Sequence, residues 1–426
     1  MAAKRYYFLR ASTFFLGFGI AISISGADLV LQKVPPLTVA QAPNYPQNLA
    51  RSDLGAQLES DVPDDASSLV PFLSGDPASV YGLRTGTTRL LISLAQIENI
   101  DSIAFLNSDA KGTVTIATSS AKLSPESPQW HDAGQEKLSS GLISARIGPA
   151  EAKYVRLTFN VSSPGCIGSL GIYSAAPVSD FTMPRARKVA AASSADAMAK
   201  VNCNLADLHA KARTIFVSSG DDLKLAYNMI DGQPGTAYGF AANDAAPTAI
   251  IDLGHSVSVN HISTFSTPSS ATVTFYLLGA LPGNNTGNLE SSLRIDPQTL
   301  AAFRTVGTGN DDGSGRVAVD FEETTGRYVM LVWTPSPRNP NFSVAEVAVF
   351  GPASNPRLLA ANTIGNNPSD TSDGKAVRDS TDAKDFIKEI PGEGPAEEQA
   401  PGDGPGPELR RPPPFVFIPR VVPTSP

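Results

Sequence analysis

Short runs of apolar and β-branched residues recur along most of this chain and are separated by polar turns. Typical runs are "ATVTFYLLG" at 271–279 and "RYVMLVW" at 327–333, each bounded by Gly, Pro, Asn or Ser. Such short, bounded runs are typical of strands buried in a sheet. Between most of them there is no apolar periodicity of helix length. The pattern therefore predicts an all-β protein built as sandwiches.

The same arrangement of runs and turns occurs twice. Four pairs of blocks align in the same order: 72–83 with 229–240, 88–108 with 248–268, 112–120 with 271–279, and 152–174 with 326–351. Ordered self-similarity of this kind is the signature of a duplicated unit. We therefore predict two copies of one domain, at 45–175 and 213–352.

The segments outside the two copies have a different character. The connector at 176–212 includes the Ala-rich stretch "SSADAMAKVNCNLADLHAKA" (193–212), which predicts a short helix or partly ordered chain. Residues 353–426 contain 13 prolines and repeated Gly-Pro, so we expect a disordered acidic tail. The end of this tail, "RRPPPFVFIPRVV" (410–422), is either solvated chain or an extended peptide that docks on a protein partner.

The N-terminus has the pattern of a secretion signal. Lys4, Arg5 and Arg10 flank the apolar core at 11–24, and "SGA" (25–27) offers small residues before a cut at Asp28. An uncleaved anchor is the alternative, although the apolar core is shorter than the roughly 20 residues of a spanning helix. No later segment reaches that length. We expect residues 1–27 to be a signal peptide and the mature protein to be secreted or periplasmic, without a transmembrane segment.

Charge and cysteine content narrow the function classes. The formal net charge is −8, whereas a general nucleic-acid-binding protein needs clustered Lys and Arg. Cys166 and Cys203 are the only cysteines, too few for a cysteine scaffold or zinc site. In an oxidising compartment they could form a disulfide, and two separate thiols are the alternative.

The second copy resembles the discoidin or coagulation-factor type C family, whose fold is a galactose-binding-like jelly-roll sandwich. The resemblance rests on "IDGQPGTAYGF", "AIIDLGHSVSVNHIS", "GRYVMLVW" and "VAEVAVFG", in the family's order. Tyr238 stands where family members commonly have Trp. The first copy matches less closely, with "ISLAQ" in place of Asp-Leu-Gly. The resemblance implies binding modules for carbohydrates, phospholipid head groups or proteins.

The resemblance also implies a structural calcium ion in the second copy, held by Asp231, Thr236 and Glu346. Calcium prefers carboxylate, hydroxyl and carbonyl oxygens, and a glycine-bearing turn lets carbonyls converge. In the first copy Ser74 replaces Asp231 and Ser169 replaces Glu346, so both charged ligands are absent together. We expect one ion in the second copy and none in the first. The alternative is an aspartate that caps its own turn.

The loop "SPRNPNF" (336–342) is the best candidate for ligand binding. Arg338, Asn339 and Asn341 could bond sugar hydroxyls, and Phe342 could pack against the apolar face of a pyranose. Aromatic residues make up only 7% of the chain, which weakens this expectation.

Catalysis has little support. The four histidines lack the spacing of metal ligands, and no nucleophile or phosphate-loop motif occurs in the required context. We therefore expect an exported, non-enzymatic protein that recognises carbohydrate or a glycoconjugate. The alternative is a structural, scaffolding or adhesion protein that binds a protein partner through the sandwiches and the Pro-rich tail. An unrecognised glycan-cleaving activity is a third, weaker possibility.

Overall fold

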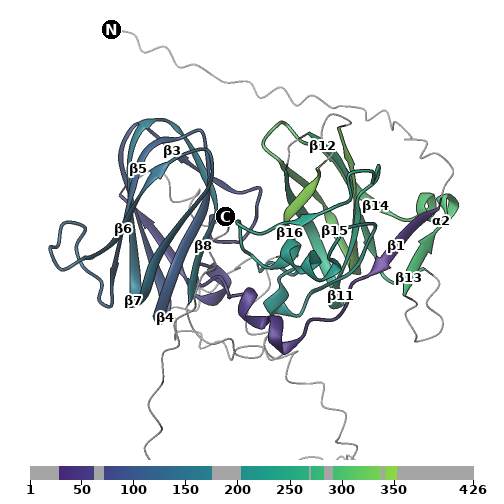
Figure 1. Cartoon of the computed structure of the whole chain (residues 1–426), viewed down its shortest axis with the longest axis horizontal. Helices are drawn as coiled ribbons and strands as arrows, with labels where there is room; N and C mark the ends of the chain where they lie inside the picture. The colour runs from purple at the N-terminus through teal and green to yellow at the C-terminus, as the bar shows by residue number, and fades with distance from the viewer. Residues whose placement is uncertain are drawn as a thin grey trace, which may run out of the picture. The chain divides into compact units, whose positions relative to one another are not determined.

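The structure is a computed structural model that describes residues 28–61, 72–174, 203–267, 270–282, 291–336 and 341–352. The predicted signal peptide at 1–27, most of the connector and the predicted tail at 353–426 lie outside these residues. The described chain consists of strands with a few short helical segments of three to eight residues, which confirms the all-β prediction (Figure 1). No described helix is long and apolar enough to cross a membrane.

The first sandwich comprises residues 48–174. Its short 3-10 turn is η2 (Ser52–Leu54), and the turn η1 (Val39–Asn44) precedes it. Its strands are β2 (Gln57–Ser60), β3 (Val80–Leu83), β4 (Gly86–Ser108), β5 (Lys111–Ser119), β6 (His131–Leu138), β7 (Gly141–Ser163) and β8 (Gly165–Ser174).

The second sandwich comprises residues 204–351 together with β1 (Leu29–Lys33). Its other strands are β9 (Arg213–Val217), β10 (Tyr238–Gly239), β11 (Thr248–Thr267), β12 (Ala271–Leu278), β13 (Ser292–Ile295), β14 (Thr305–Asn310), β15 (Arg316–Pro335) and β16 (Ser343–Phe350). Its helical turns are η4 (Leu208–Ala210), η5 (Leu223–Ile230) and α2 (Pro297–Ala302).

The two sandwiches pair their strands in the same order. In the first, β4 pairs with β2, β7 and β8; in the second, β11 pairs with β9, β15 and β16. Both long central strands change partners along their length, and both have register shifts, between Ser93 and Glu98 and between Asp252 and Val257. Bulges bend a strand, which lets one strand contribute to both faces of a sandwich.

Each sandwich has its own apolar core. Alternate residues of β5 and β7, such as Val114, Ile116 and Leu157, are fully buried in the first. In the second, strands β11 and β15 are buried over consecutive residues, for example Val329–Trp333. Consecutive burial means that both faces of this sheet are covered. Trp333 is completely buried, as expected for a core residue.

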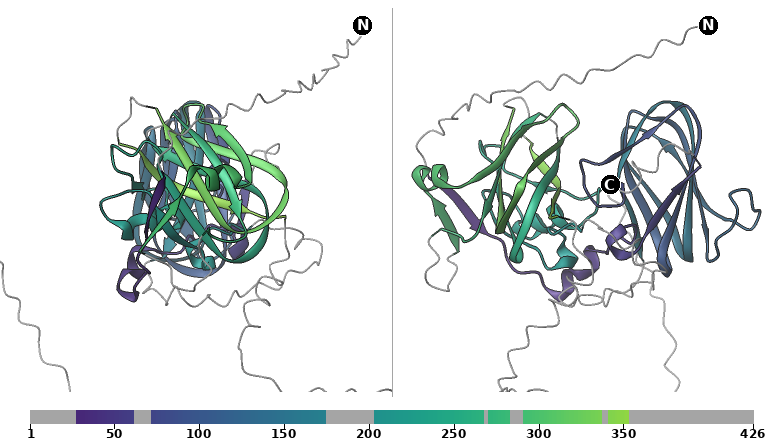
Figure 2. Two further views of the ribbon diagram at one scale, coloured as in Figure 1. Left: turned by 90° about the vertical axis from the view of Figure 1, so that its right-hand side faces the viewer. Right: turned by 180° about the vertical axis from the view of Figure 1, so that it is seen from behind.

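The outer cover of the second sandwich comes partly from the start of the described chain. Strand β1 lies between β9 and β13, and Leu31 packs fully buried in a second apolar cluster with Phe216 and Ile250. Figures 1 and 2 show β1, in purple, alongside the green strand β13. The N-terminal strand therefore belongs to the second sandwich although it precedes the first in sequence.

Part of the predicted connector belongs to the second sandwich. The side-chain oxygen of Asn204 accepts hydrogen bonds from the backbone of Ala206 and of Val349 on β16. Asn48 makes the matching bonds to Ala50 and Ile172 in the first sandwich. Residues 203–212 therefore form an ordered strap with one 3-10 turn, because the asparagine ties them to the final strand.

The predicted pairing of the two cysteines is not found. Cys166 lies at the start of β8, and Cys203 is the first residue of the strap at 203–212 in the second sandwich. The structure contains no Cys166–Cys203 disulfide, and both side chains are partly exposed. Sequence spacing could not place the two residues, since the strap joins the second sandwich and not the first.

Candidate functional site

The turn that follows η5 positions the first candidate ligand of the metal site. Asp222 caps the start of η5 by accepting the Lys224 amide, and the helix ends at Asp231. Gly232 follows with φ of 68°, a left-handed conformation that glycine adopts without strain. This local sequence points the Asp231 carboxylate back over its own turn.

Asp231 is almost completely buried and collects several hydrogen bonds. Thr236 donates its hydroxyl to both carboxylate oxygens, at 3.0 and 2.9 Å. Gln233 donates its backbone amide to one oxygen and its side-chain amide to the other, each at 2.9 Å. Burial raises the pKa of Asp231 to about 8, even though these bonds favour the ionised form. Asp231 thus caps its own turn and also lies in contact with Thr236.

Glu346 approaches the same turn from β16. One of its oxygens accepts the backbone amide of Gly232 at 3.1 Å. The other oxygen, Oε1, is buried and has no hydrogen-bond partner among the described residues. Burial, and next the neighbouring Asp231, raise the pKa of Glu346 well above its usual range. Two carboxylates that are far apart in sequence therefore meet at one glycine.

These residues fit a bound calcium ion. A buried carboxylate oxygen without a partner is costly, and hard oxygen donors with two negative charges are the ligands calcium prefers. Asp231, Thr236 and Glu346 would hold the ion, and the ion would neutralise the paired carboxylates. Its part would be structural, since both carboxylate ligands are buried.

A buried arginine lies near this cluster. The guanidinium of Arg51, from the first sandwich, binds Asp53 at 3.2 Å and Asp207 at 3.0 Å. Burial alone would lower the pKa of Arg51, but Asp53 and Asp207 raise it overall. None of the hydrogen bonds among the described residues joins Arg51 to Asp231 or Glu346. The arginine forms ion pairs with Asp53 and Asp207, which sequence inspection did not single out, and its charge also acts on Glu346, where it partly opposes the rise in pKa.

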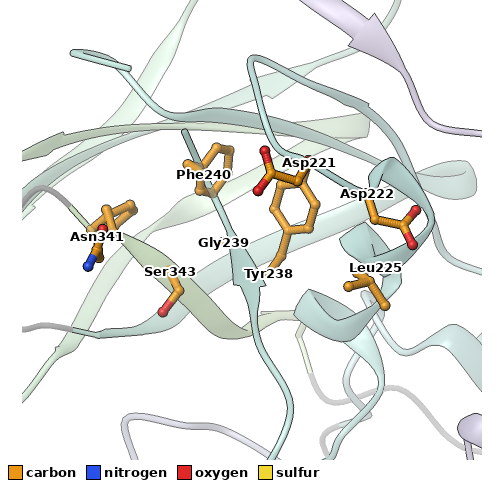
Figure 3. Close-up of a pocket in the computed structure, with 9 residues that line it drawn as sticks. Asp221, Asp222, Leu225, Tyr238, Gly239, Phe240, Asn341 and Ser343 are labelled. Carbon is orange, nitrogen blue, oxygen red and sulfur yellow. The ribbon is translucent and has the colours of Figure 1, made fainter. Parts of the chain in front are cut away.

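A pocket of about 380 Å³ lies close to the turn, in the second sandwich. Its lining comprises Asp221, Asp222, Leu225, Tyr238, Gly239, Phe240, Asn341, Phe342 and Ser343. In Figure 3 the Asp221 carboxylate lies above the Tyr238 ring, with Asp222 and Leu225 on one side and Asn341 and Ser343 on the other. The rim is polar and the floor aromatic.

The structure separates the four predicted ligand-binding residues. Asn341 is exposed and lines the pocket. Phe342 lines it too, but its ring is only 3% exposed and packs 6.1 Å from the rings of Phe240 and Trp333. It therefore supports the floor and is not an open stacking platform. Arg338 and Asn339 lie outside the described residues.

Sequence reasoning missed Asp221 and Asp222 as pocket residues. They precede a helical turn and read as a capping sequence, which Asp222 indeed provides. Their contribution to the pocket comes from the approach of the 341–343 segment through the pairing of β10 with β16. A local pattern carries no signal for that approach.

His261, on β11, lies at a contact between the sandwiches. Its Nδ1 lies 2.7 Å from Asp320 and its Nε2 lies 3.4 Å from Asp76 of the first sandwich. Ser263 donates to the same Asp76 at 2.6 Å. Burial alone would lower the pKa of His261, but hydrogen bonds to Asp76 and Asp320 raise it overall.

Comparisons with known proteins give structural neighbours of low identity. No family model matches the chain, and no curated protein matches it. A fucolectin from striped bass (Morone saxatilis) serum is 14% identical, with 72% of this chain and 98% of that chain covered and a TM-score of 0.26. A chitosan-binding module from a Paenibacillus chitosanase/glucanase is 22% identical, covering 35% and 98%, with a TM-score of 0.27.

A third neighbour is an enzyme. Allantoicase from Saccharomyces cerevisiae is 12% identical, with 75% of this chain and 99% of that chain covered and a TM-score of 0.26. Similarity at this level does not assign the chain to a family, and the neighbours' own activities are not transferred to it.

Proposed function

We propose that this is an exported, non-catalytic protein that binds carbohydrate in the pocket of the second sandwich. The observation that carries the proposal is the pocket itself, which joins the predicted loop residue Asn341 to Asp221 and Asp222 over an aromatic floor. Its volume falls in the range of small-ligand pockets, roughly 300–1,000 Å³. Partly apolar pockets with a few polar groups are typical of such sites.

The chemistry of the rim suits a polyhydroxylated ligand. Carboxylates accept hydrogen bonds from hydroxyl groups, and the Asn341 amide both donates and accepts. Leu225 is 47% exposed beside them and offers apolar surface to the C–H face of a sugar ring. The Tyr238 hydroxyl is unavailable, because it donates to the Ser219 carbonyl at 2.6 Å. Recognition would therefore depend on the rim residues.

Two accessory features belong to the same proposal. A calcium ion held by Asp231, Thr236 and Glu346 would stabilise the turn that leads into Tyr238 and Gly239 of the pocket. Export rests on the sequence of residues 1–27. Cleavage before Asp28 would leave strand β1 intact, since it begins at Leu29. Mass spectrometry of the secreted or periplasmic protein would give the mature N-terminus.

The test is a glycan array followed by calorimetry with the best ligand. Asp221→Asn should weaken binding roughly tenfold, since one hydrogen bond to a charged group contributes about 1.5 kcal/mol or more. Asn341→Ala should weaken it by roughly two- to tenfold, since a hydrogen bond to a neutral amide contributes about 0.5–1.5 kcal/mol. Asp132→Asn, at an exposed strand residue of the first sandwich, is the matched control and should bind as the wild type does.

The outcomes separate the alternatives. Unchanged affinity in both pocket variants would place the ligand elsewhere. Absence of glycan binding would leave the scaffold or adhesion alternative, whose proposed tail lies outside the described residues. Release of reducing ends from the bound glycan would contradict the non-catalytic part.

A further inference from the structure

The turn that carries Asp231 is covered by residues of the first sandwich and its lead-in segment. The Tyr173 hydroxyl donates to the Gly232 carbonyl at 2.8 Å. The Gln233 side-chain amide donates to the Asn44 carbonyl at 3.1 Å. Tyr173 is 5% exposed, so its phenol is enclosed at this contact. The candidate metal site therefore has a lid that its own sandwich does not supply.

Gly232 is the point where the two sandwiches meet. Its N–H donates to Glu346 of the second sandwich, and its carbonyl accepts from Tyr173 of the first. Both bonds fix the orientation of the same residue, whose left-handed backbone only glycine adopts without strain. A change in the position of Tyr173 would thus move the amide that holds Glu346.

Only the first sandwich has the residues that make this contact, as a comparison of matched positions shows. In the alignment of the two final strands, Tyr173 corresponds to Phe350 and Gly171 to Ala348. A β-carbon at Gly171 would lie 2.1 Å from the Tyr173 hydroxyl, so glycine is required for the phenol to reach Gly232. The second copy has neither the hydroxyl nor the glycine. The first sandwich alone carries both features.

We propose that the first sandwich closes the calcium site of the second, so that calcium binding and docking of the two sandwiches are coupled through Tyr173 and Gly232. The inference rests on the calcium part of the proposed function. Coupling between two binding events is reciprocal. Docking therefore strengthens calcium binding, and calcium strengthens docking by the same factor.

The first test measures calcium affinity by calorimetry on the full chain. Tyr173→Phe removes one hydroxyl and should weaken Ca²⁺ binding roughly five- to tenfold, the value of one buried hydrogen bond. Gly171→Ala should act in the same direction by displacing the phenol. Tyr81→Phe is the control. Its buried hydroxyl bonds Ser60 within the first sandwich, and calcium affinity should stay unchanged.

The second test reads each sandwich separately. The chain has two tryptophans, Trp130 in the first sandwich and Trp333 in the second, so 5-fluorotryptophan gives one ¹⁹F signal for each. Calcium should raise the unfolding temperature reported by both signals in the wild type. In Tyr173→Phe it should raise the Trp333 transition much more than the Trp130 transition.

The results distinguish this inference from the metal proposal. If the wild type binds no calcium, the proposed metal site is wrong and the coupling falls with it. If calcium binds but Tyr173→Phe and Gly171→Ala retain wild-type affinity, the metal site stands and the coupling is wrong. Calcium stabilisation confined to the Trp333 signal in the wild type would contradict the coupling as well.

Discussion

The turns at 72–83 and 229–240 share a left-handed glycine but place their acidic residue on opposite sides of it. Gly75 and Gly232 both have a left-handed backbone, with φ of 79° and 68°. A β-carbon at Gly75 would lie 2.8 Å from the guanidinium carbon of Arg51, whereas at Gly232 it would meet only Asn48, at 3.9 Å. In the first sandwich, the Arg51 side chain therefore places a positive charge against the turn.

The residue before each glycine also differs between the two turns. Ser74 in the first sandwich accepts the Asp76 amide and carries no charge. Asp231 in the second is a buried carboxylate beside Glu346. The first turn packs against Arg51 and has its acid one residue after the glycine, at Asp76, whereas the second has its acid one residue before the glycine, beside Glu346. The comparison teaches that the two turns share glycine, proline and tyrosine, while the position of the acid and its partners differ.

Residues at matched positions also bind each other. Aligning the two asparagine straps on Asn48 and Asn204 places Arg51 opposite Asp207, and these two form the buried ion pair. The first-sandwich turn contacts the second sandwich in return, because Asp76 accepts from Ser263 and Pro77 accepts from Arg316. The two sandwiches are therefore complementary at positions where their aligned residues differ.

The largest effect should come from breaking the ion pair at the matched positions. Arg51→Met leaves Asp53 and Asp207 as buried charges without their cation and should lower the free energy of unfolding by about 3–5 kcal/mol. Urea denaturation measures it. Arg146→Met removes an arginine that is 83% exposed, and it should cost less than about 1 kcal/mol. Equal effects of the two variants would mean that the junction contributes no special stability.

The next effect tests which sandwich the N-terminal strand stabilises. Leu31→Ala opens a cavity in the outer cluster of the second sandwich and should cost about 2–5 kcal/mol. The loss should appear in the Trp333 signal before the Trp130 signal. Val30→Ala, at a side chain 44% exposed, is the neighbouring control. If the Trp130 signal unfolded first, β1 would stabilise the first sandwich and the prediction would be wrong.

The third prediction converts the second turn to the residues of the first. Asp231→Ser with Glu346→Ser should abolish stabilisation by calcium, which amounts to about 2.7 kcal/mol at a hundredfold excess over Kd. In the presence of a chelator, the folding stability of the double variant should equal or exceed that of the wild type, because two buried carboxylates are removed. Thermal unfolding with Ca²⁺ and with EGTA tests both statements. A calcium-dependent shift that persists in the variant would refute the assigned ligands.

The smallest effect concerns pH. The raised pKa of His261 means that the folded state binds its proton more tightly than the unfolded state. This contribution is complete below the unfolded pKa of about 6.5 and disappears as the pH rises through the folded pKa. His261→Gln should therefore lower stability at pH 6 more than at pH 8, as read by urea midpoints. His255→Gln, at an exposed histidine, should show no such difference.

The sequence alone determined the class of fold, and its four aligned pairs of blocks predict two copies of one domain. Alternating apolar residues fix strands because side chains alternate across a sheet, and the shared Gly, Pro and Tyr fix the turn. The same local pattern indicated Asp231 and, through the family resemblance, Thr236 and Glu346. The structure brings these three residues to one turn, and the identity of any ion there stays a prediction.

Tertiary structure decided the rest, because the contacts join residues without any local pattern in common. Strand β1 enters the second sandwich beside a strand more than a hundred residues away in sequence, and the Tyr173 hydroxyl reaches a carbonyl in the other copy. Asp221 and Asn341 line one pocket because β10 pairs with β16. Periodicity specifies which face of a strand is buried. Which partner meets that face depends on how the whole chain packs.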